Sequence, residues 1–462
     1  MSFPRYPAYK DSGVEWLGEV PQNWSVYSLK RTVDGCVNGL WGDEPDGEND
    51  IAVIRVADFE RSFSTVGLDK LTYRSITRKE RQSRLIKSGD LLIEKSGGGE
   101  KTLVGCVVLF THEFDAITSN FVARMRPLAE FDSQFLCYAF GNLYHGRVNY
   151  PSVKQVTGIQ NLDAESYLQE RFCFPARVEQ TQIARFLDHE TARIDALIEE
   201  QQRLIELLKE KRQAVISHAV TKGLDPKVPM KHSGVEWLGE VPAHWVVRKL
   251  KNLVSVRGGS TPSKEVERYW EGDIPWVSPK DMKSERISDS IDHVSDSAIK
   301  DGGLNMVKGG AILIVVRGMI LIHSVPVAIT DVDVTINQDM KAMTPCAELS
   351  SDYLSLLLQG VRDAVFQYID SSAHGTRKLE WERFELINLP VPSHSEQNSI
   401  VSSIEMQKRA IDDLTEQAAS AITLMKERRS ALISAAVTGK IDVRGWQPSA
   451  SVPIPELVQE AV

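Results

Sequence analysis

The chain has 462 residues, of which 42% are hydrophobic and 25% charged, and its formal net charge is −9. This composition is ordinary for a soluble globular protein, and the length predicts two to four domains. The acidic total counts against a simple nucleic-acid binder, although a local basic patch is compatible with it because electrostatic footprints are local.

Export and membrane insertion are not indicated by the sequence. The first residues, MSFPRYPAYK, lack the apolar core of a signal peptide. The longest purely apolar run, residues 311–316, ends at Arg317 and is far shorter than a membrane span. The cysteines form no CxxC pair, and their odd number and scattered positions indicate free thiols. We therefore expect a cytoplasmic protein without a zinc site.

The chain begins with a motif that it later repeats. Residues 12–24 read SGVEWLGEVPQNW and residues 233–245 read SGVEWLGEVPAHW, so only two of the thirteen positions differ. The likeness continues through residues 29–30 and 250–251. Two nearly identical segments that lie 221 residues apart indicate an internal duplication.

Each motif is followed by a region in which predicted strands come first and predicted helices come late. This order is typical of an α+β domain with a mixed or barrel-like sheet. The two regions diverge in sequence, but corresponding segments recur in the same order. They are IAVIRVADF at 51–59 and IPWVSPKDM at 274–282, SGDLLIEKSGGG at 88–99 and KGGAILIVVRGM at 308–319, TSNFVARMRP at 118–127 and TINQDMKAMTP at 335–345, and apolar helices near 133–144 and 351–368.

Two charged segments without Gly or Pro, 179–221 and 396–438, repeat apolar residues at spacings of three and four. A period of 3.5 is typical of a coiled coil, and a long exposed helix is the alternative for one segment alone. Because the segments match each other 217 residues apart, we expect them to pair antiparallel as rods of roughly 60 Å. The predicted seam consists of Ile183, Leu187, Ile194, Leu197, Leu204, Leu208 and Val215 in the first segment and Ile400, Ile404, Ile411, Leu414, Ala421, Met425 and Leu432 in the second. The pattern is interrupted at Glu190, Gln201 and Lys211, and at the matching Gln407, Ala418 and Arg428.

No segment has the pattern of an active site. Asp90, Glu94 and Lys95 distantly resemble a metal-dependent nuclease triad, but neighbouring residues of a strand point to opposite faces. The run from Gly97 to Thr102 does not satisfy the phosphate-loop pattern GxxxxGK[ST]. The sequence contains neither HExxH nor GxSxG. We therefore expect no catalytic residue and no metal site.

Basic and polar side chains in loops are the candidates for DNA contacts. The segment RSITRKERQSRLIK at 74–87 carries six cations and one glutamate, which suits contact with phosphates. A solvated helix face is the alternative for this segment. Arg, Lys, Gln and Asn side chains can also read base edges in the major groove. The candidates are Arg74, Arg78, Lys79, Arg81, Arg84, Lys95, Lys101, Lys154 and Gln155 in the first half, and Arg257, Lys280, Lys283, Arg317, Gln338, His374, Arg377 and Lys378 in the second.

Three features recur together in both halves: the SGVEWLGEVPxxW motif, a proline followed by Glu-Gln-x-x-Ile at the start of the long helix, and an Ile-Ser…Ala-Val-Thr helix end. Together they resemble the specificity subunits of Type I restriction-modification systems, and the resemblance covers nearly the whole chain. The helix starts are Pro175, Glu179, Gln180 and Ile183 in the first half, and Pro392, Glu396, Gln397 and Ile400 in the second.

The resemblance implies a non-catalytic subunit with two target recognition domains, each reading one half of a bipartite sequence in double-stranded DNA. It also implies that the long helices act as a ruler and dock modification methyltransferase subunits, and through them restriction subunits. S-adenosyl methionine and ATP would then be bound by the partner subunits, and this chain would carry no cofactor.

We therefore expect an α+β fold in which two α/β target recognition domains are separated by two long helices, which form an antiparallel coiled coil in a pseudo-twofold internal repeat. One alternative is a coiled-coil scaffold that presents two protein-binding domains. Another is a single-chain nuclease or methyltransferase. The predicted parts are recognition domain 1 at 1–178, the central helix at 179–222, a linker with recognition domain 2 at 223–395, the C-terminal helix at 396–445 and a tail at 446–462.

Overall fold

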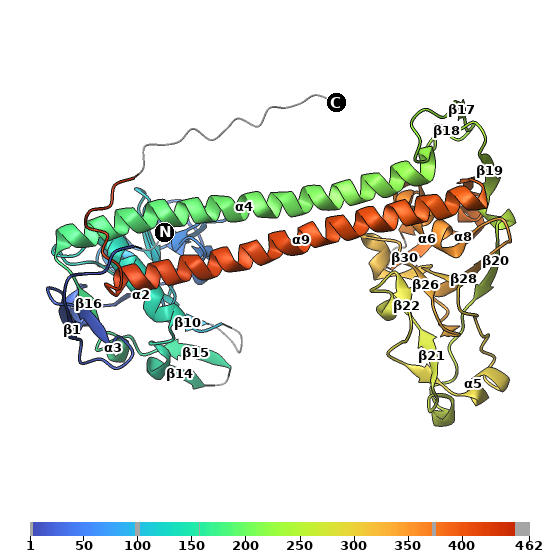
Figure 1. The fold of residues 1–462 in the computed structure, drawn as a ribbon. Helices are drawn as coiled ribbons and strands as arrows, with labels where there is room; N and C mark the ends of the chain where they lie inside the picture. The colour runs from blue at the N-terminus through green and yellow to red at the C-terminus, as the bar shows by residue number, and fades with distance from the viewer. Residues whose placement is uncertain (1–2, 98–101, 157, 372–375, 449–462) are drawn as a thin grey trace. The chain divides into compact units, whose positions relative to one another are not determined.

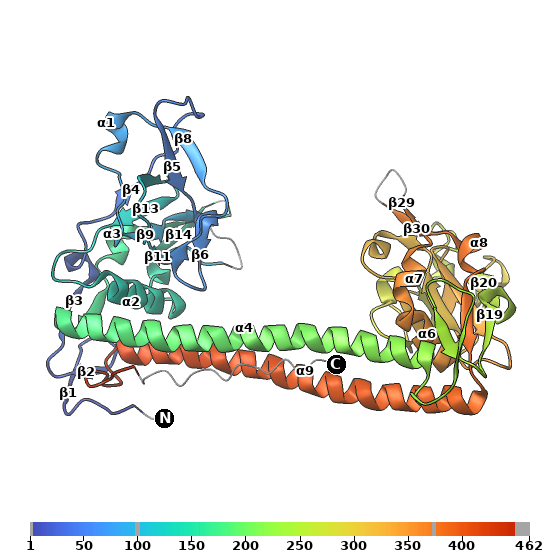
Figure 2. The same ribbon diagram turned by 90° about the horizontal axis from the view of Figure 1, so that it is seen from above.

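The computed structural model describes residues 3–97, 102–156, 158–371 and 376–448 (Figures 1 and 2). The chain divides into two compact units: unit 1 comprises residues 1–200 and 421–462, and unit 2 comprises residues 201–420. Two predicted DNA-contact residues, Lys101 and His374, lie outside the described residues, as does most of the predicted tail. Among the residues that are described, no helix is long and apolar enough to cross a membrane.

Unit 1 is built on a mixed six-stranded sheet with smaller sheets beside it. Its strand β9 (Leu91–Glu94) is buried along its whole length, as its apolar run predicts. Helix α2 (Ser133–His145) packs against this sheet and shares a core cluster with it. The six-stranded order is β4 (Val37–Asn38), β13 (Val122–Met125), β9, β11 (Val107–Leu109), β7 (Thr65–Val66), β6 (Phe59–Glu60); the other sheets are β12 (Ala116–Thr118), β5 (Asp50–Ile54), β8 (Thr72–Ser75); β10 (Ser96–Gly97), β15 (Ile159–Leu162), β14 (Val153–Val156); β16 (Arg171–Phe174), β3 (Ser25–Ser28); and β1 (Tyr9–Asp11), β2 (Glu19–Pro21).

Unit 2 repeats this arrangement sheet by sheet. Its five-stranded sheet matches the order β4 to β7 of unit 1, and each smaller sheet has a counterpart with the same connections. The shared topology confirms the internal repeat. The sheets are β20 (Val254–Gly258), β28 (Met340–Pro345), β24 (Ile312–Val315), β26 (Val327–Thr330), β22 (Arg286–Ile287); β23 (His293–Val294), β21 (Ile274–Val277), β27 (Thr335–Ile336); β25 (Arg317–Gly318), β30 (Arg377–Leu379), β29 (Ile369–Ser371); β19 (Val246–Lys249), β31 (Asn388–Val391); and β17 (Met230–His232), β18 (Glu240–Pro242).

The apolar helix predicted near 133–144 is α2, which begins after Asp132, whose carboxylate accepts hydrogen bonds from the backbone N–H groups of two first-turn residues. The helix predicted at 351–368 is two helices, because the backbone leaves the helical conformation at Val361. These are α6 (Ser351–Gly360) and α7 (Arg362–Phe366). The remaining short helices are α1 (Arg78–Arg81), α3 (Ala164–Tyr167), α5 (Asp296–Lys300) and α8 (Trp381–Phe384), with 3-10 turns η1 (Leu29–Arg31), η2 (Val56–Asp58), η3 (Tyr150–Ser152), η4 (Leu250–Asn252), η5 (Glu267–Tyr269), η6 (Pro279–Asp281) and η7 (Met319–Ile322).

Two long helices, α4 (Arg177–Lys222) and α9 (His394–Val437), occur where the heptad pattern predicts them. In unit 1, the Asp195 carboxylate on α4 lies 3.0 Å from Arg429 Nε on α9. Residues nearer the start of α4 share a core cluster with residues nearer the end of α9, so residue numbers rise along one helix as they fall along the other. The helices are therefore antiparallel in this unit.

Unit 2 contains the matching pair of contacts. Arg212 and Asp412, which correspond to Arg429 and Asp195 across the 217-residue repeat, approach to 3.8 Å. Ile216 near the end of α4 shares a core cluster with residues near the start of α9. The predicted antiparallel pairing thus holds within each unit.

The seam between the helices differs from the predicted one. Leu197, Leu204 and Leu414 are 40–49% exposed, so their prediction as buried seam residues is wrong. The spacing of three and four instead passes through Thr191 and Ala418, both buried. Thr191 can occupy a buried position because its hydroxyl donates to the Leu187 carbonyl, at 2.7 Å. Ala418 has no polar side-chain group that needs a partner. Of the other predicted residues, Ile183, Leu187, Ile194, Leu208, Ile400, Ile404 and Ile411 are buried, whereas Val215, Ala421, Met425 and Leu432 are half-buried.

The repeated motif and the Glu-Gln helix start contact each other. In unit 1, the indole Nε1 of Trp24 donates to the Glu179 carboxylate at 3.1 Å, and the Tyr6 hydroxyl donates to the same oxygen at 2.6 Å. In unit 2, Trp245 Nε1 donates to Glu396 at 2.9 Å. Each motif therefore fixes the start of one long helix, which explains why the two segments recur together in both halves.

The glutamine after each glutamate ties the long helix to its domain. Gln180 accepts the backbone N–H of Asp132, at 2.9 Å, and Gln397 accepts that of Ser350, at 2.8 Å. Asp132 and Ser350 are the residues that cap α2 and α6. Both glutamines are buried, so these bonds are shielded from water.

We expect Glu179→Ala to lower the free energy of unfolding of unit 1 by about 2–4 kcal/mol, because the buried Tyr6 and Trp24 donors lose their shared acceptor. Chemical denaturation followed by tryptophan fluorescence would measure the loss. Glu199→Ala, at an exposed position on the same helix, is the matched control and should change little. Equal stability of the two variants would contradict the anchoring role of Glu179.

Candidate nucleic-acid interface

The basic segment 74–87 lies on β8 and α1, at the end of unit 1 away from α4 in Figure 2. Helix α1 begins with a capping box, in which Thr77 and Glu80 bond to each other's backbone N–H groups. Arg74 pairs with Glu44 and lies over the Trp41 ring, with 4.5 Å from its Cζ to the ring centroid. The Arg78 and Lys79 side chains are exposed, so this segment presents positive charge to solvent.

Other predicted residues of unit 1 already have partners. Lys95 donates to the Asn38 side chain at 2.7 Å. Lys154 pairs with Asp163 at 2.8 Å, and this hydrogen bond raises the pKa of Lys154. Gln155 is exposed on β14, at the edge of the sheet that contains β10 and β15. These residues are not gathered into one cluster with segment 74–87.

In unit 2, the structure brings three predicted residues together on one small sheet. Arg317 of β25 is paired in the strand ladder with Lys378 of β30, and Gly318 is paired with Arg377. Gln338 lies in the turn that precedes β28 and accepts a hydrogen bond from Thr261. Arg317 and Lys378 therefore share one face of this sheet, whereas Arg377 points to the other face. Arg317 Nε also lies 3.9 Å from the Asp339 carboxylate.

The other predicted residues of unit 2 lie elsewhere. Arg257 on β20 donates to the Met306 carbonyl at 3.1 Å. Lys280 belongs to turn η6 and pairs with Asp292 at 2.6 Å, which raises the pKa of Lys280. Lys283 is exposed just after this turn. The positive charge of Lys280 is therefore balanced by the neighbouring Asp292 carboxylate.

Unit 1 contains a hollow of about 490 Å³ beside turn η2, called here the first hollow. Its walls are mostly apolar, and three large side chains on its rim, Trp41, Phe121 and Ile159, are 36%, 49% and 52% exposed. The hydroxyl of Ser119 lies in the lining, buried and without a hydrogen-bond partner. The described residues that line it are Trp41, Arg55, Val56, Ala57, Ser96, Gly97, Ser119, Asn120, Phe121 and Ile159.

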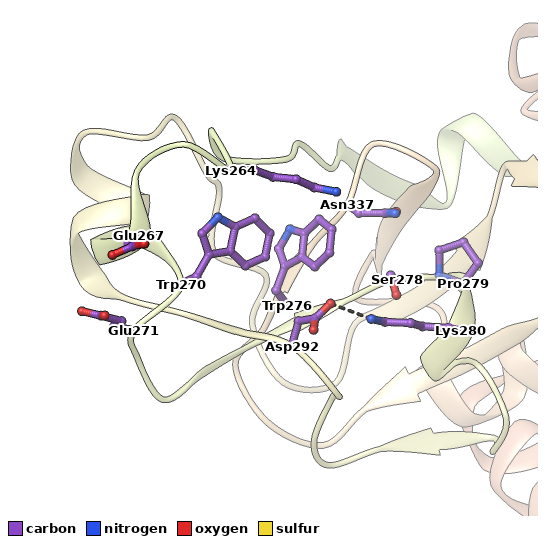
Figure 3. Close-up of a pocket in the computed structure, with 10 residues that line it drawn as sticks. All are labelled: Lys264, Glu267, Trp270, Glu271, Trp276, Ser278, Pro279, Lys280, Asp292 and Asn337. Atoms are coloured by element: carbon purple, nitrogen blue, oxygen red, sulfur yellow. Dashed lines mark hydrogen bonds and ion pairs between the residues drawn. The ribbon is translucent and has the colours of Figure 1, made fainter.

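Unit 2 contains a hollow of about 800 Å³ beside turn η6, called here the second hollow (Figure 3). Trp270 and Trp276 meet edge to face, with their ring centroids 5.1 Å apart. The Lys280–Asp292 pair lies next to them in Figure 3. The lining also carries Lys264, Glu267, Glu271, Ser278, Pro279 and Asn337, so it is more polar than that of the first hollow.

The two hollows occupy matching places in the repeat. At the start of turn η2 the backbone N–H of Arg55 donates to the Asp58 carboxylate at 2.8 Å, and at η6 that of Ser278 donates to the Asp281 carboxylate at 2.8 Å. Ser119 N–H donates to the Ile54 carbonyl at 2.8 Å, and Asn337 N–H donates to the Val277 carbonyl at 3.0 Å. Ser119 therefore corresponds to Asn337. Aligning the two segments at Thr118 and Thr335 would instead match Ser119 with Ile336, one residue earlier.

A glycine brings a further segment against each hollow. A Cβ atom on Gly39 would lie 1.9 Å from the Thr118 carbonyl oxygen, and one on Gly259 would lie 1.9 Å from the Asn337 carbonyl oxygen. Only glycine allows this close approach of two backbones. The residues two positions later, Trp41 and Thr261, are thereby held at corresponding places.

The carboxylates of the nuclease-like pattern bind arginines. Glu94, which is buried, pairs with Arg61 at 2.7 Å, and burial raises the pKa of Glu94. Asp90 accepts two hydrogen bonds from Arg126, both 2.7 Å long. Both carboxylates thus take part in ion pairs that support strand β9 and its neighbours.

A family model described as the Type I restriction modification DNA specificity domain matches residues 242–424. A specificity subunit of the Type I restriction enzyme EcoR124I/EcoR124II from Escherichia coli is 29% identical over 42% of this chain and 45% of its own length. Residues 242–424 thus match this family, and the chain is similar to Type I restriction-modification specificity subunits. The MjaIX specificity subunit from Methanocaldococcus jannaschii is 31% identical over 39% of this chain, and the match spans 40% of that subunit.

A relative with longer coverage is the putative MjaX specificity subunit from Methanocaldococcus jannaschii, which is 22% identical over 93% of this chain and 96% of its own length. Two solved structures share the fold of this chain. One, from work on complex assembly and conformational transition of the type I R-M system, has a TM-score of 0.70, with 13% identity over 90% of this chain and 98% of that one. The HsdS subunit from Thermoanaerobacter tengcongensis has a TM-score of 0.56, with 14% identity over 91% and 98%.

Sequence reasoning predicted Lys280 in the second hollow but missed the other described lining residues of both hollows. Trp41, Ser119 and Phe121 carry no charge, and they lie far apart in the sequence. Trp270 and Trp276 resemble ordinary core residues in the sequence. A position-by-position comparison of the two repeats could have drawn attention to them. Trp41 of the first repeat corresponds to Thr261 of the second, and Phe121 corresponds to Asp339.

Proposed function

We propose that the chain is the DNA sequence-specificity subunit of a Type I restriction-modification complex. The two recognition domains would be residues 1–178 and 223–395, each reading one half of a bipartite target, with residues 179–222 and 396–445 as the connecting helices. The observation that carries the proposal is the pair of matching hollows, framed by the same backbone but lined by different side chains. Reading two unlike half-sites requires this combination of a repeated frame and divergent contacts.

The long helices would dock two modification methyltransferase subunits. Exposed leucines on these helices are the candidate contacts for these subunits. Unit 1 exposes Leu197 and Leu424, and unit 2 exposes Leu414 and Leu207, which match them across the 217-residue repeat. Two matched apolar surfaces suit two copies of one partner.

In this proposal the chain performs no chemistry of its own. Adenine methylation, with S-adenosyl methionine, would belong to the methyltransferase subunits, and ATP-dependent restriction to subunits that join through them. The assembly would act in the cytoplasm, on double-stranded DNA.

Binding of the assembled complex to a library of DNA duplexes tests the proposal. We expect enrichment of one sequence made of two fixed parts and a spacer of constant length, and methylation within it. A coiled-coil scaffold that presents two protein-binding domains would show no sequence enrichment in this experiment. The purified chain without partners should not methylate or cleave DNA, and activity of the chain alone would contradict its non-catalytic role.

We expect Arg78→Ala combined with Arg81→Ala to weaken DNA binding by the complex and to make it less sensitive to salt. Each lost phosphate contact lowers the slope of log affinity against log salt by about 0.9, so two lost contacts lower it by about 1.8. Titrations at several salt concentrations would measure the slope. Arg5→Ala, an exposed arginine in the N-terminal segment, is the control. An unchanged slope in the double variant would assign segment 74–87 to a solvated surface.

A further inference from the structure

The first hollow exposes apolar side chains that the fold holds in place. The Phe121 carbonyl accepts two backbone hydrogen bonds, from Lys95 at 2.8 Å and from Ser96 at 3.2 Å. The Trp41 ring is covered on one face by the Arg74 guanidinium. Phe121 nevertheless remains 49% exposed, on a turn that both bonds fix. The backbone therefore holds the exposed Phe121 at a fixed place on the surface.

The fold of the domain does not need apolar residues at these positions. The Asp339 carbonyl accepts the Val316 N–H at 2.8 Å, as the Phe121 carbonyl accepts that of Lys95, so Asp339 corresponds to Phe121. Thr261 corresponds to Trp41, two residues after the matching glycine. The same backbone thus accepts polar residues in unit 2. The apolar rim of unit 1 is therefore a feature of its surface chemistry.

One polar group in the first hollow lacks a partner. Ser119 is only 1% exposed, and its hydroxyl makes no hydrogen bond. The Arg55 guanidinium at the same hollow is engaged by Asp58, with Nη2–Oδ1 at 2.7 Å. The Ser119 hydroxyl is not accessible from the hollow, so the contacts that the hollow offers come from its exposed rim. The hollow thus combines mostly apolar walls with the polar residues Arg55, Ser96, Ser119 and Asn120.

The charge around the first hollow suits DNA. Strand β8, which begins the basic segment, pairs with β5, and β5 leads directly into turn η2 at the hollow. Phosphates bound along segment 74–87 would bring base edges to the rim formed by Trp41 and Phe121. Among the groups that base pairs present in the major groove, the apolar one is the 5-methyl group of thymine.

We propose that the first hollow reads the 5-methyl group of a thymine in the half-site of recognition domain 1, with Phe121 as the main specificity-determining contact. This inference rests on the proposed DNA-specificity function. Recognition domain 2, with Asn337, Gln338 and Arg317 near the corresponding positions, would read its half-site by hydrogen bonds.

Replacing thymine by deoxyuridine removes only the methyl group and tests this directly. The target is first mapped by sequencing methylated DNA, and its half-sites are assigned by domain exchange. The full complex is then titrated against duplexes with single dT-to-dU changes. We expect at least one change in the first half-site to weaken binding about fourfold or more, the equivalent of burying one methyl group. Changes in the second half-site should alter binding less than twofold.

A double-mutant cycle assigns the contact to Phe121. Phe121→Ala should weaken binding to the normal duplex by a similar factor and should show no additional loss with the dU duplex. Phe63→Ala, an exposed phenylalanine of the same domain outside the hollow, is the matched control and should retain the full dU effect.

The outcomes separate this inference from the proposed function. Sequence-specific binding that tolerates dU throughout the first half-site overturns the methyl contact and leaves the proposed function intact. A first half-site without thymine overturns it in the same way. Absence of any sequence-specific binding overturns both. A dU effect that persists at full size in Phe121→Ala moves the contact to another residue and contradicts the role of Phe121.

Discussion

Exchange of residues 25–175 for the corresponding domain of another specificity subunit is expected to change one half-site of the DNA target and leave the other intact. The ends of this segment lie side by side, because β3 pairs antiparallel with β16, and Phe174 lies opposite Ser25 in that ladder. The exchanged segment thus begins and ends at one place in the fold. Trp24 and Glu179, which anchor the helix, stay with the recipient.

The hybrid should fold when the incoming domain keeps its contacts with the start of α4. The most important is the hydrogen bond from the backbone of Asp132 to buried Gln180, because Asp132 also caps α2. Methylation mapping of DNA treated with the hybrid complex gives the answer. A full change of the first half-site is expected, with the second half-site and the spacer length unchanged. Alteration of both half-sites would show that the domains do not read independently.

The same contacts explain what the sequence could predict. The duplicated motif and the Glu-Gln starts are short and contiguous, and each is fixed by its partner, as in the bond between Trp245 and Glu396. Selection for such a bond leaves a recognisable string of residues. The two long helices were predictable for a similar reason, since their periodicity is local.

Other features depend on three-dimensional neighbours and were not predictable. Leu197 has the spacing of a seam residue but is exposed, while Thr191 is buried because its hydroxyl bonds to its own helix. Lys154 and Lys280 are positively charged in the sequence, but each is paired with an aspartate that only the fold brings close. The hollows combine residues from several separate segments, so no single stretch of sequence contains their pattern.

Lengthening both long helices by one heptad is expected to change the spacing of the half-sites without changing their bases. Within unit 1, the insertions belong between Leu197 and Ile198 on α4 and between Lys426 and Glu427 on α9. These points face each other, because the Asp195–Arg429 pair sets the alignment of the helices. Copies of residues 191–197 and 420–426 would preserve the seam. Neither insertion touches a recognition domain.

Seven residues add about 10 Å to a helix. B-DNA rises about 3.4 Å per base pair, so the spacer should grow by about three base pairs. These added pairs also rotate the second half-site by roughly 100°, since B-DNA has about 10.5 pairs per turn. Methylation activity should therefore fall unless the helices or the DNA twist to compensate. Sequencing of the methylated sites measures both the spacer and the bases.

An insertion into α4 alone is the matched control. With seven extra residues in α4 only, the Asp195–Arg429 and Arg212–Asp412 pairs cannot both form. Stability and activity should therefore be lost without a new spacer preference. The paired insertion should instead keep a folded complex with a longer preferred spacer. Unchanged spacing at full activity in the paired variant would mean that the helices do not set the distance between half-sites.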